Sequence, residues 1–229
     1  MLYDETAVRA NIRNRDGRRV FFLHHGDQLT SSARDYLTRE RIEIRPGEQA
    51  KIERYRLLSG GFLEEKPEHM THLNGDVLVE KTHPRIVFRG AMDSLEAEIL
   101  LCQLHVEEKT RGQLEDVLAL ARQIVRSEVL EEPLKWERLC GLTEQEQRSR
   151  SHRPQDFYGQ PHFMPEAADG AAILHVNRCR CAARNAELKA AAAFRDGEGN
   201  PTRVDILQAL NRMSSMLYIL MIQLKAEKK

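Results

Sequence analysis

The sequence lacks the features that direct a protein to a membrane or out of the cell. Its N-terminus, MLYDETAVRAN, has no basic stretch followed by an apolar run, and no apolar segment approaches about 18 residues. Only four cysteines occur, Cys102, Cys140, Cys179 and Cys181, scattered in a chain without a secretory signal. We therefore expect a cytoplasmic protein with reduced thiols and no membrane partner.

An excess of charge of either sign is also lacking. The chain carries 35 basic and 35 acidic side chains, so its formal net charge is zero. No long-range field attracts nucleic acid or an anionic surface, and nucleic acid is not an expected partner. Any site for an anion must therefore be local.

Common catalytic and metal-binding motifs are missing. The sequence has no GxxxxGK[ST] phosphate loop, Gly-x-Ser-x-Gly, His-Glu-x-x-His or dinucleotide fingerprint. Cys179 and Cys181 lie two residues apart on a predicted helix, so their side chains diverge by about 200° and cannot share one zinc ion. The one Glu-x-x-His match, Glu80 to His83, directly precedes Pro84 and does not suit a di-iron bundle.

The residues that are present predict two domains. Residues 1–65 hold short, mixed elements, and Thr30 can cap a helix there. The expected elements are a capped helix at Asp4–Asn14, the strands RRVFFLH and RIEI, and the helix SSARDYLTRER. We predict a small N-terminal α/β appendage over 1–65 and a second domain over 66–229.

The second domain is predicted to be a helical bundle. Apolar residues recur at helical spacing in Ala91–Glu108, Gln113–Leu130, Ala171–Phe194 and Arg203–Lys225. The stretch LTEQEQRSR adds a short helix, capped by Thr143 with Glu146 three residues later. The predicted fold class is therefore all-α, a bundle of four long helices plus a short one, with the α/β appendage.

Two long connections accompany these helices. Lys66–Arg89 contains Asn74-Gly75, which favours a tight hairpin turn. Glu131–Asp169 contains the aromatic, His-rich stretch HRPQDFYGQPHFMP. Two interpretations of that stretch are open: a lid over a ligand, or an ordered crossover packed on the bundle.

A charged stripe crosses the Ala-rich helix at 171–194. At about 100° per residue, Arg180, Arg184 and Glu187 fall on one face, roughly within 60° of one another. Two guanidiniums one turn apart suit a polyphosphate, because each can hold two anionic oxygens and neither loses its charge. The alternative is that they form salt bridges with Glu187 and a neighbouring helix.

A second candidate site is the basic segment before the first long helix. Lys81, Arg85 and Arg89 precede a helix whose first turns are predicted to contain Asp93 and Glu96. A helix N-terminus with nearby cations favours anions, since its free N–H groups point outward. The alternative is a solvated basic loop capped by Asp93.

A third candidate is Asn211, which lies among leucines on the last helix. Asparagine is costly to bury without a partner, so something should hydrogen-bond it. The partner is either a ligand or a polar network in the core.

Several segments then form a series: KPEHMTHL, LVEKTHPRIVFRGAMDSLEA, RSEVLEEPL, SHRPQDFYGQPHFMPEA, the Arg-rich helix and DILQALNRMSS. In this order they resemble the ethanolamine-utilisation type of ATP:cob(I)alamin adenosyltransferase, and LTSSARDYLTRERIEI resembles that family's leading segment. The resemblance runs from about residue 29 to 224. The chain is more distantly similar to the propanediol-utilisation type, which implies a trimer of helical bundles with ATP bound between subunits.

The resemblance implies ATP-binding roles for residues of both candidate regions. Lys81 and Arg85 match basic positions that hold ATP, and Asn211 matches an asparagine that contacts the nucleoside. Thr71 matches the phosphate-binding loop, although the glycines of the distant relative's loop are absent.

It also implies roles in catalysis and in cobalamin binding. Arg180, Arg184 and Glu187 match an Arg-x-x-x-Arg-x-x-Glu pattern that handles triphosphate and magnesium, so Glu187 would meet metal only through Mg-ATP. Asp93 matches an acid that pairs with Arg180 across the subunit interface. Phe163 matches an aromatic that crowds the lower face of the corrin.

One feature of the family is absent. Some members carry a His followed by a Cys-Cys-x-x-Cys cluster, which implies a bound divalent metal, just before the KP segment. Here Pro46–Glu65 contains neither His nor Cys. We therefore do not expect metal dependence of that type.

The implied activity moves the 5′-deoxyadenosyl group of ATP to the cobalt of cob(I)alamin, with ATP, magnesium and cobalamin as the implied ligands. No general base is needed, so the missing Ser-His-Asp motif fits this activity. Expected partners are further copies of the chain, a corrinoid reductase and a cobalamin-dependent enzyme, with a cytoplasmic location in or on a bacterial microcompartment. The alternatives are a noncatalytic adenosylcobalamin carrier, a microcompartment-associated binding protein or a nucleotide-binding regulator.

Overall fold

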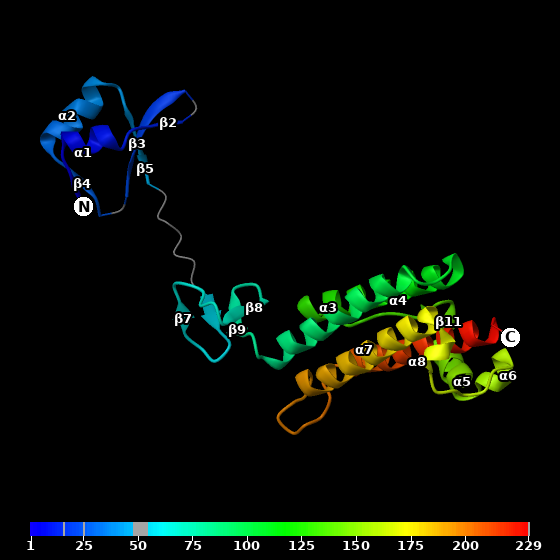
Figure 1. The fold of residues 1–229 in the computed structure, drawn as a ribbon. Helices are drawn as coiled ribbons and strands as arrows, with labels where there is room; N and C mark the ends of the chain where they lie inside the picture. The colour runs from blue at the N-terminus through cyan, green and yellow to red at the C-terminus, as the bar shows by residue number, and fades with distance from the viewer. Residues whose placement is uncertain (16, 25, 48–54, 229) are drawn as a thin grey trace. The chain divides into compact units, whose positions relative to one another are not determined.

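A computed structural model of the protein describes residues 1–15, 17–24, 26–47 and 55–228 (Figure 1). The chain divides into two compact units, residues 1–55 with 62–65 and residues 56–61 with 66–229. The predicted domain boundary at residue 65 stays a prediction. In the described ranges, no helix combines the length and the apolar character needed to span a bilayer.

The first unit is a small α/β fold. Its described elements are β1 (Leu2–Tyr3), α1 (Glu5–Ala10), β2 (Arg13–Arg15), β3 (Arg18–Leu23), β4 (Gln28–Leu29), α2 (Ser31–Arg39), β5 (Glu43–Pro46) and β7 (Phe62–Leu63). Strand β3 pairs antiparallel with β2 and parallel with β5, and β1 pairs parallel with β4. As expected, Thr30 caps α2 by accepting a hydrogen bond from the Ala33 N–H. A core that includes Phe21, Tyr36 and Leu37 joins the helices to this sheet.

Four long helices dominate the second unit, as the hydrophobic periodicity predicts. They are α3 (Pro84–Gln103), α4 (Glu108–Val129), α7 (Ala171–Ala193) and α8 (Val204–Ala226). Helix α3 packs against α4 and α7, and α7 packs against α8, so the helices lie side by side (Figure 1). Their apolar faces form one continuous core, in which Phe88 meets Phe194 edge to face at a centroid distance of 5.3 Å.

The predicted all-α class is wrong, because the second unit also contains β-structure. Residues expected to form a long connection make β8 (Met70–Asn74) and β9 (Val77–Glu80), an antiparallel hairpin whose β9 also pairs with β6 (Tyr55–Leu57). The turn at Gly75 has the positive φ of +49° that favours glycine. Leu73, Val77 and Val79 form a separate small cluster, so the hairpin buries apolar side chains of its own. The fold is mostly helical with several small sheets.

The first long helix begins earlier than expected. His83 caps α3 by accepting a hydrogen bond from the Arg85 N–H at 3.3 Å, and Pro84 follows as the first helical residue. Asp93 therefore lies roughly two and a half turns inside the helix rather than in its first turn. Arg85 and Arg89 are on the helix itself, not ahead of it.

The crossover between α4 and α7 is more ordered than expected. It contains β10 (Arg138–Leu139), β11 (Leu142–Thr143), α5 (Glu144–His152), α6 (Pro154–Tyr158) and a 3-10 turn at Ala167–Asp169. The capping box of Thr143 and Glu146 is confirmed, with both reciprocal hydrogen bonds present. Both α5 and α6 pack against α8, which fits an ordered crossover rather than a mobile lid.

Candidate functional site

Facing residues of α7 and α8 form paired polar contacts. The Asn211 Nδ2 donates a hydrogen bond to the Glu187 Oε1 at 2.9 Å, so the polar partner expected for Asn211 is present. Seven residues away on each helix, the Arg180 guanidinium lies 5.5 Å from the centre of the Tyr218 ring. The helices run antiparallel here, and seven residues correspond to about 10 Å along the axis. These two contacts define the α7/α8 face.

Arg184 lies between these two contacts and is exposed. Within the described part of the chain, neither Arg184 nor Arg180 forms an ion pair with a carboxylate. The salt-bridge interpretation of the stripe therefore has no support inside one chain, and both cations are available to an outside anion. The second oxygen of Glu187, Oε2, is likewise without a hydrogen-bond partner among the described residues.

The main-chain oxygen of Asn211 is also bonded. It accepts hydrogen bonds from the hydroxyls of Ser214 and Ser215, at 2.9 and 3.1 Å. Its side-chain oxygen accepts from the neighbouring Arg212, whose Nη1 is buried without a partner. Arg212 was not among the predicted site residues, yet it places a further guanidinium beside Asn211, with one buried nitrogen that has no partner among the described residues.

Tyr218 joins the crossover to the α7/α8 face. The His162 Nε2 lies 3.2 Å from the His152 carbonyl, which can only accept, so Nε2 carries the proton. In the neutral ring Nδ1 then accepts the hydrogen bond from the Tyr218 hydroxyl at 3.0 Å. The Phe163 N–H also donates to the Tyr218 oxygen, at 3.4 Å. Phe163 and Arg180, predicted for cobalamin and triphosphate, are thus linked through one tyrosine that the sequence did not single out.

The other predicted ATP residues lie on the hairpin and at the start of α3. Thr71 is half-buried on β8, and Lys81 follows β9 as an exposed residue. The Lys81 N–H donates to the His69 carbonyl at 3.0 Å, which closes the end of the hairpin. The Lys81 ammonium has no carboxylate partner among the described residues.

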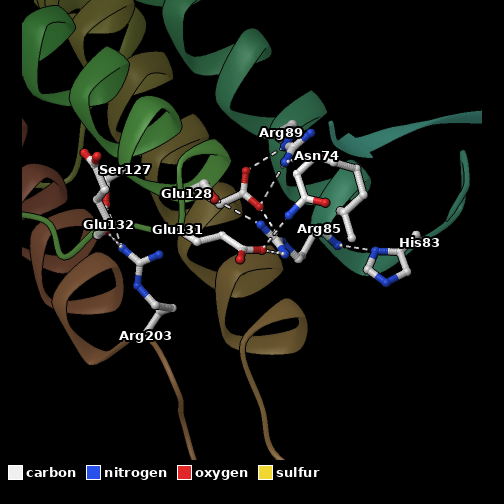
Figure 2. A network of polar contacts seen from close by, with 10 residues as sticks. Asn74, His83, Arg85, Arg89, Ser127, Glu128, Glu131, Glu132 and Arg203 are labelled. Atoms are coloured by element: carbon white, nitrogen blue, oxygen red, sulfur yellow. Dashed lines mark hydrogen bonds and ion pairs between the residues drawn. The ribbon is translucent and has the colours of Figure 1, made fainter. Parts of the chain in front are cut away.

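Arg85, in contrast, is held by carboxylates of the same chain (Figure 2). Its Nε is 2.5 Å from the Glu128 Oε1 and its Nη1 is 2.8 Å from the Glu131 Oε1. Its Nη2 donates to the Glu128 main-chain oxygen at 3.0 Å. Burial alone would lower the pKa of Arg85, but hydrogen bonds to Glu131 and Glu128 outweigh burial and raise it, so this side chain stays charged.

Glu128 is the centre of this network and is fully buried. Its other oxygen accepts from the Arg89 Nε at 2.6 Å, and the Arg89 Nη2 donates to the Leu73 carbonyl on β8 at 2.8 Å. Asn74, at the end of β8, donates to the Glu131 Oε1 at 3.0 Å. Arg85, Arg89, Glu128 and Glu131 therefore connect the hairpin, α3 and α4 with balanced charge (Figure 2).

Glu128 and Glu131, both in the segment RSEVLEEPL, were not predicted as site residues. A signal was present for Glu128. It continues the apolar series Leu114, Val117, Ala121 and Ile124 on α4, where a carboxylate is unexpected. A charged residue in the line of core positions indicates a buried partner of opposite charge.

Asp93 is exposed on α3, and no described residue of the chain pairs with it. Its predicted partner, Arg180, contacts Tyr218 instead. The predicted pair across a subunit interface is thus left as a prediction. No group of three or more His, Cys, Asp or Glu side chains in the described residues is arranged to hold a metal ion.

An open pocket of about 830 Å³ lies apart from these residues. It is lined by the crossover and the start of α8, including Trp136, Arg148 and Gln208. None of the predicted ATP or cobalamin residues lines it. The candidate site is therefore defined by the α7/α8 face and the hairpin rather than by this pocket.

The fold and the site together define a helical-bundle protein suited to a polyanionic ligand. A family model described as cobalamin adenosyltransferase matches residues 62–224. The corrinoid adenosyltransferase EutT of Salmonella typhimurium (strain LT2) is 32% identical over 241 aligned residues, covering 95% of this chain and 90% of the relative. EutT of Escherichia coli (strain K12) is 35% identical over 157 residues, covering 69% of this chain and 59% of the relative. The chain belongs to the cobalamin adenosyltransferase family.

Proposed function

We propose that this protein is a corrinoid adenosyltransferase that moves the 5′-deoxyadenosyl group of ATP to the cobalt of cob(I)alamin. In this reaction a cobalt–C5′ bond forms as the C5′–O5′ bond of ATP breaks. Triphosphate leaves with the electron pair, and the products are adenosylcobalamin and triphosphate. The observation that carries the proposal is the α7/α8 face, where Arg184 and Arg180 have no carboxylate partner among the described residues and lie beside Glu187 and Asn211.

The main task of the protein in this reaction is to stabilise the leaving triphosphate. Negative charge grows on it as the bond breaks, and cations fixed in advance stabilise that charge without reorganisation. Arg184 and Arg180 carry this task on α7, and Lys81 adds a cation from the end of the hairpin. Arg85 keeps one N–H on each of Nη1 and Nη2 for a ligand, because acceptors in the described part of the chain use one N–H on each nitrogen.

The nucleoside and the magnesium of ATP are assigned to the Glu187–Asn211 pair. Hydrogen bonding to Glu187 fixes the Asn211 amide, and its second N–H would then contact the base or ribose of ATP. Magnesium bound to ATP takes few protein carboxylates and keeps several waters, so the free Oε2 of Glu187 suffices to meet it. Magnesium there would neutralise part of the triphosphate charge.

Cobalamin is assigned to the surface around Phe163. This ring packs against the bundle core, and the Lys225 ammonium lies 5.4 Å from its centre. The Tyr218 hydroxyl anchors the same segment to α8. A fixed aromatic there would exclude water and the lower cobalt ligand from the reacting face.

The assembly is proposed to be a homotrimer with ATP between subunits, which gives the unpaired Asp93 and Arg180 a partner. Leu100 and Leu101 of α3 and Leu104, the residue that follows the helix, are 46, 47 and 76% exposed and would be covered by such contacts. We place the enzyme in the cytoplasm, in ethanolamine or related microcompartment metabolism, supplied by a corrinoid reductase.

The proposal is tested by mixing protein, ATP and chemically reduced cobalamin without oxygen. The corrin spectrum should change to that of adenosylcobalamin at a rate that depends on enzyme concentration, with one triphosphate released per product. Retention of unmodified cobalamin on the protein would instead indicate a carrier. Binding of ATP without any affinity for cobalamin would indicate a nucleotide-binding regulator.

A further inference from the structure

The turn after α4 contains a glutamate in a backbone conformation that favours glycine. Helix α4 ends in a Schellman motif, in which the Glu132 N–H donates to the Ser127 carbonyl and the Glu131 N–H donates to the Glu128 carbonyl. Glu131 occupies the left-handed position of this motif, with φ of 57°. Glycine adopts that conformation without steric cost, whereas a glutamate there stores backbone strain that favourable side-chain contacts can offset.

The side chain of Glu131 accepts two hydrogen bonds. Its Oε1 accepts a hydrogen bond from the Arg85 Nη1 at 2.8 Å and another from the Asn74 Nδ2 at 3.0 Å (Figure 2). One carboxylate oxygen thereby joins the end of β8 to the first turn of α3. Glu128 supports the same two elements from the core side, through Arg85 and Arg89.

The turn itself is fixed from the opposite side. The Arg203 Nη2, at the start of α8, donates to the Ser127 Oγ at 2.7 Å and to the Glu132 carbonyl at 3.0 Å (Figure 2). Glu131 thus extends from a turn that both α4 and α8 hold in place. A rigid support of this kind can set the position of the groups it bonds.

We propose that Glu131 is a positioning residue for ATP, because its carboxylate clamps the β8–β9 hairpin to α3 and orients Arg85. The groups it positions are Thr71 on β8 and Lys81 at the end of β9, together with the two free N–H groups of Arg85. This inference rests on the proposed function, in which these residues hold ATP. Glu131 itself does not contact the reacting atoms.

The test compares three variants that separate positioning from folding. Glu131→Gly removes the clamp and also relieves the left-handed backbone. Glu131→Gln keeps an oxygen that can accept from Arg85 and Asn74. Arg41→Gly is the matched control, because Arg41 occupies the same Schellman position after α2 in the first unit, with φ of 52°, and its side chain is exposed.

We expect Glu131→Gly to raise the KM for ATP about tenfold, as expected for the loss of a charge-assisted contact, and to leave the KM for cob(I)alamin unchanged. Its melting temperature should match or exceed that of the wild type, as for Arg41→Gly. Glu131→Gln should keep the KM for ATP within about threefold of the wild type. The Kd for ATP, measured by calorimetry without cobalamin, should follow the KM values.

An ATP KM and Kd for Glu131→Gly within about twofold of the Arg41→Gly values would overturn the proposal. A large drop in melting temperature, with both KM values rising together, would also overturn it, because a merely structural contact acts in that way. If the wild type fails to adenosylate cobalamin, the proposed function fails. The difference in ATP Kd between Glu131→Gly and Arg41→Gly then still decides whether Glu131 positions ATP.

Discussion

Arg184 is the residue on which the chemical argument depends most. Its neighbours on the α7/α8 face are engaged, since Glu187 bonds Asn211 and Arg180 lies over Tyr218. Arg184 is exposed and has no carboxylate partner in the described ranges of the chain. An unpaired guanidinium costs little in water, and it is available when a polyanion arrives.

Replacing Arg184 by alanine should lower kcat/KM for adenosyl transfer by about 100-fold or more, since a single donor to developing charge contributes on the order of 3 kcal/mol. The helix should remain folded, because alanine is a good helix former and Arg184 forms no ion pair with the described residues. Lys189→Ala removes another exposed cation from α7 and is the control. Equal activities of the two variants in the anaerobic assay would remove the triphosphate role from Arg184.

His83 should make stability depend on pH. Burial lowers the pKa of His83, and the nearby charges of Arg85 and Arg89 lower it further. The unfolded state then binds the proton more readily, so the contribution of neutral His83 is complete above about pH 6.5 and is lost as the pH falls through the lowered folded-state pKa.

His83→Asn keeps a capping side chain without the titration. Urea unfolding measured between pH 7.5 and 5 should show a smaller loss of stability for this variant than for the wild type. An identical pH dependence in both proteins would show that His83 does not titrate in this way.

At the scale of elements, the structure differs most from the sequence-based prediction at the start of α3 and in the hairpin before it. The first turns of α3 contain Arg85 and Arg89 beside the buried Phe88, and both arginines pair with Glu128 on another helix. Periodicity in one segment cannot reveal a partner 39 or 43 residues away. The long helices were predictable because their apolar faces repeat over many turns.

The residues of the candidate site also fall into those that one segment of sequence can predict and those that only the folded chain identifies. Arg180, Arg184 and Glu187 share one face of a single helix, so their spacing was enough to predict a charged stripe, while its role in ATP binding came from the family resemblance and stays a prediction. Glu131 and Tyr218 act through contacts between distant elements, and only the folded chain identifies them. The left-handed backbone of Glu131 has no sequence signal at all, because glycine is the residue that such a turn favours.

Glu128 should be the most sensitive charged residue of the bundle. Its substitution by alanine leaves Arg85 and Arg89 partly buried without their main counter-ion, which typically costs about 3–5 kcal/mol. Glu98→Ala is the control, because Glu98 pairs with Arg178, whose side chain is 59% exposed. The loss of this exposed pair should lower the free energy of unfolding by about 1 kcal/mol or less. Urea unfolding should separate the two variants clearly. Similar losses would mean that the Glu128 network contributes little to folding.

At the scale of the whole molecule, the proposed homotrimer would depend on contacts between subunits. Asp93 and Arg180 are on neighbouring helices of one chain, yet within the described residues they do not pair. Opposite charges left unpaired on α3 and α7 suit an interface in which each meets its counterpart on another copy. The exposed leucines of α3 add apolar area to such an interface.

Reversing one charge should therefore weaken the oligomer. Asp93→Arg and Arg180→Asp should each shift the protein toward monomers in sedimentation velocity, because like charges then face each other. The double variant should recover the assembly in part. Single variants that remain fully assembled, or a double variant no better than either single one, would contradict a direct pair across the interface.

The central claim is that this chain transfers the adenosyl group itself. The most direct measurement follows the corrin spectrum after anaerobic mixing of the wild-type protein with ATP and cob(I)alamin, with triphosphate measured in the same samples. The account predicts catalytic formation of adenosylcobalamin and equal amounts of triphosphate, both strongly reduced by Arg184→Ala. Bound but unchanged cobalamin, with no triphosphate released, would contradict it.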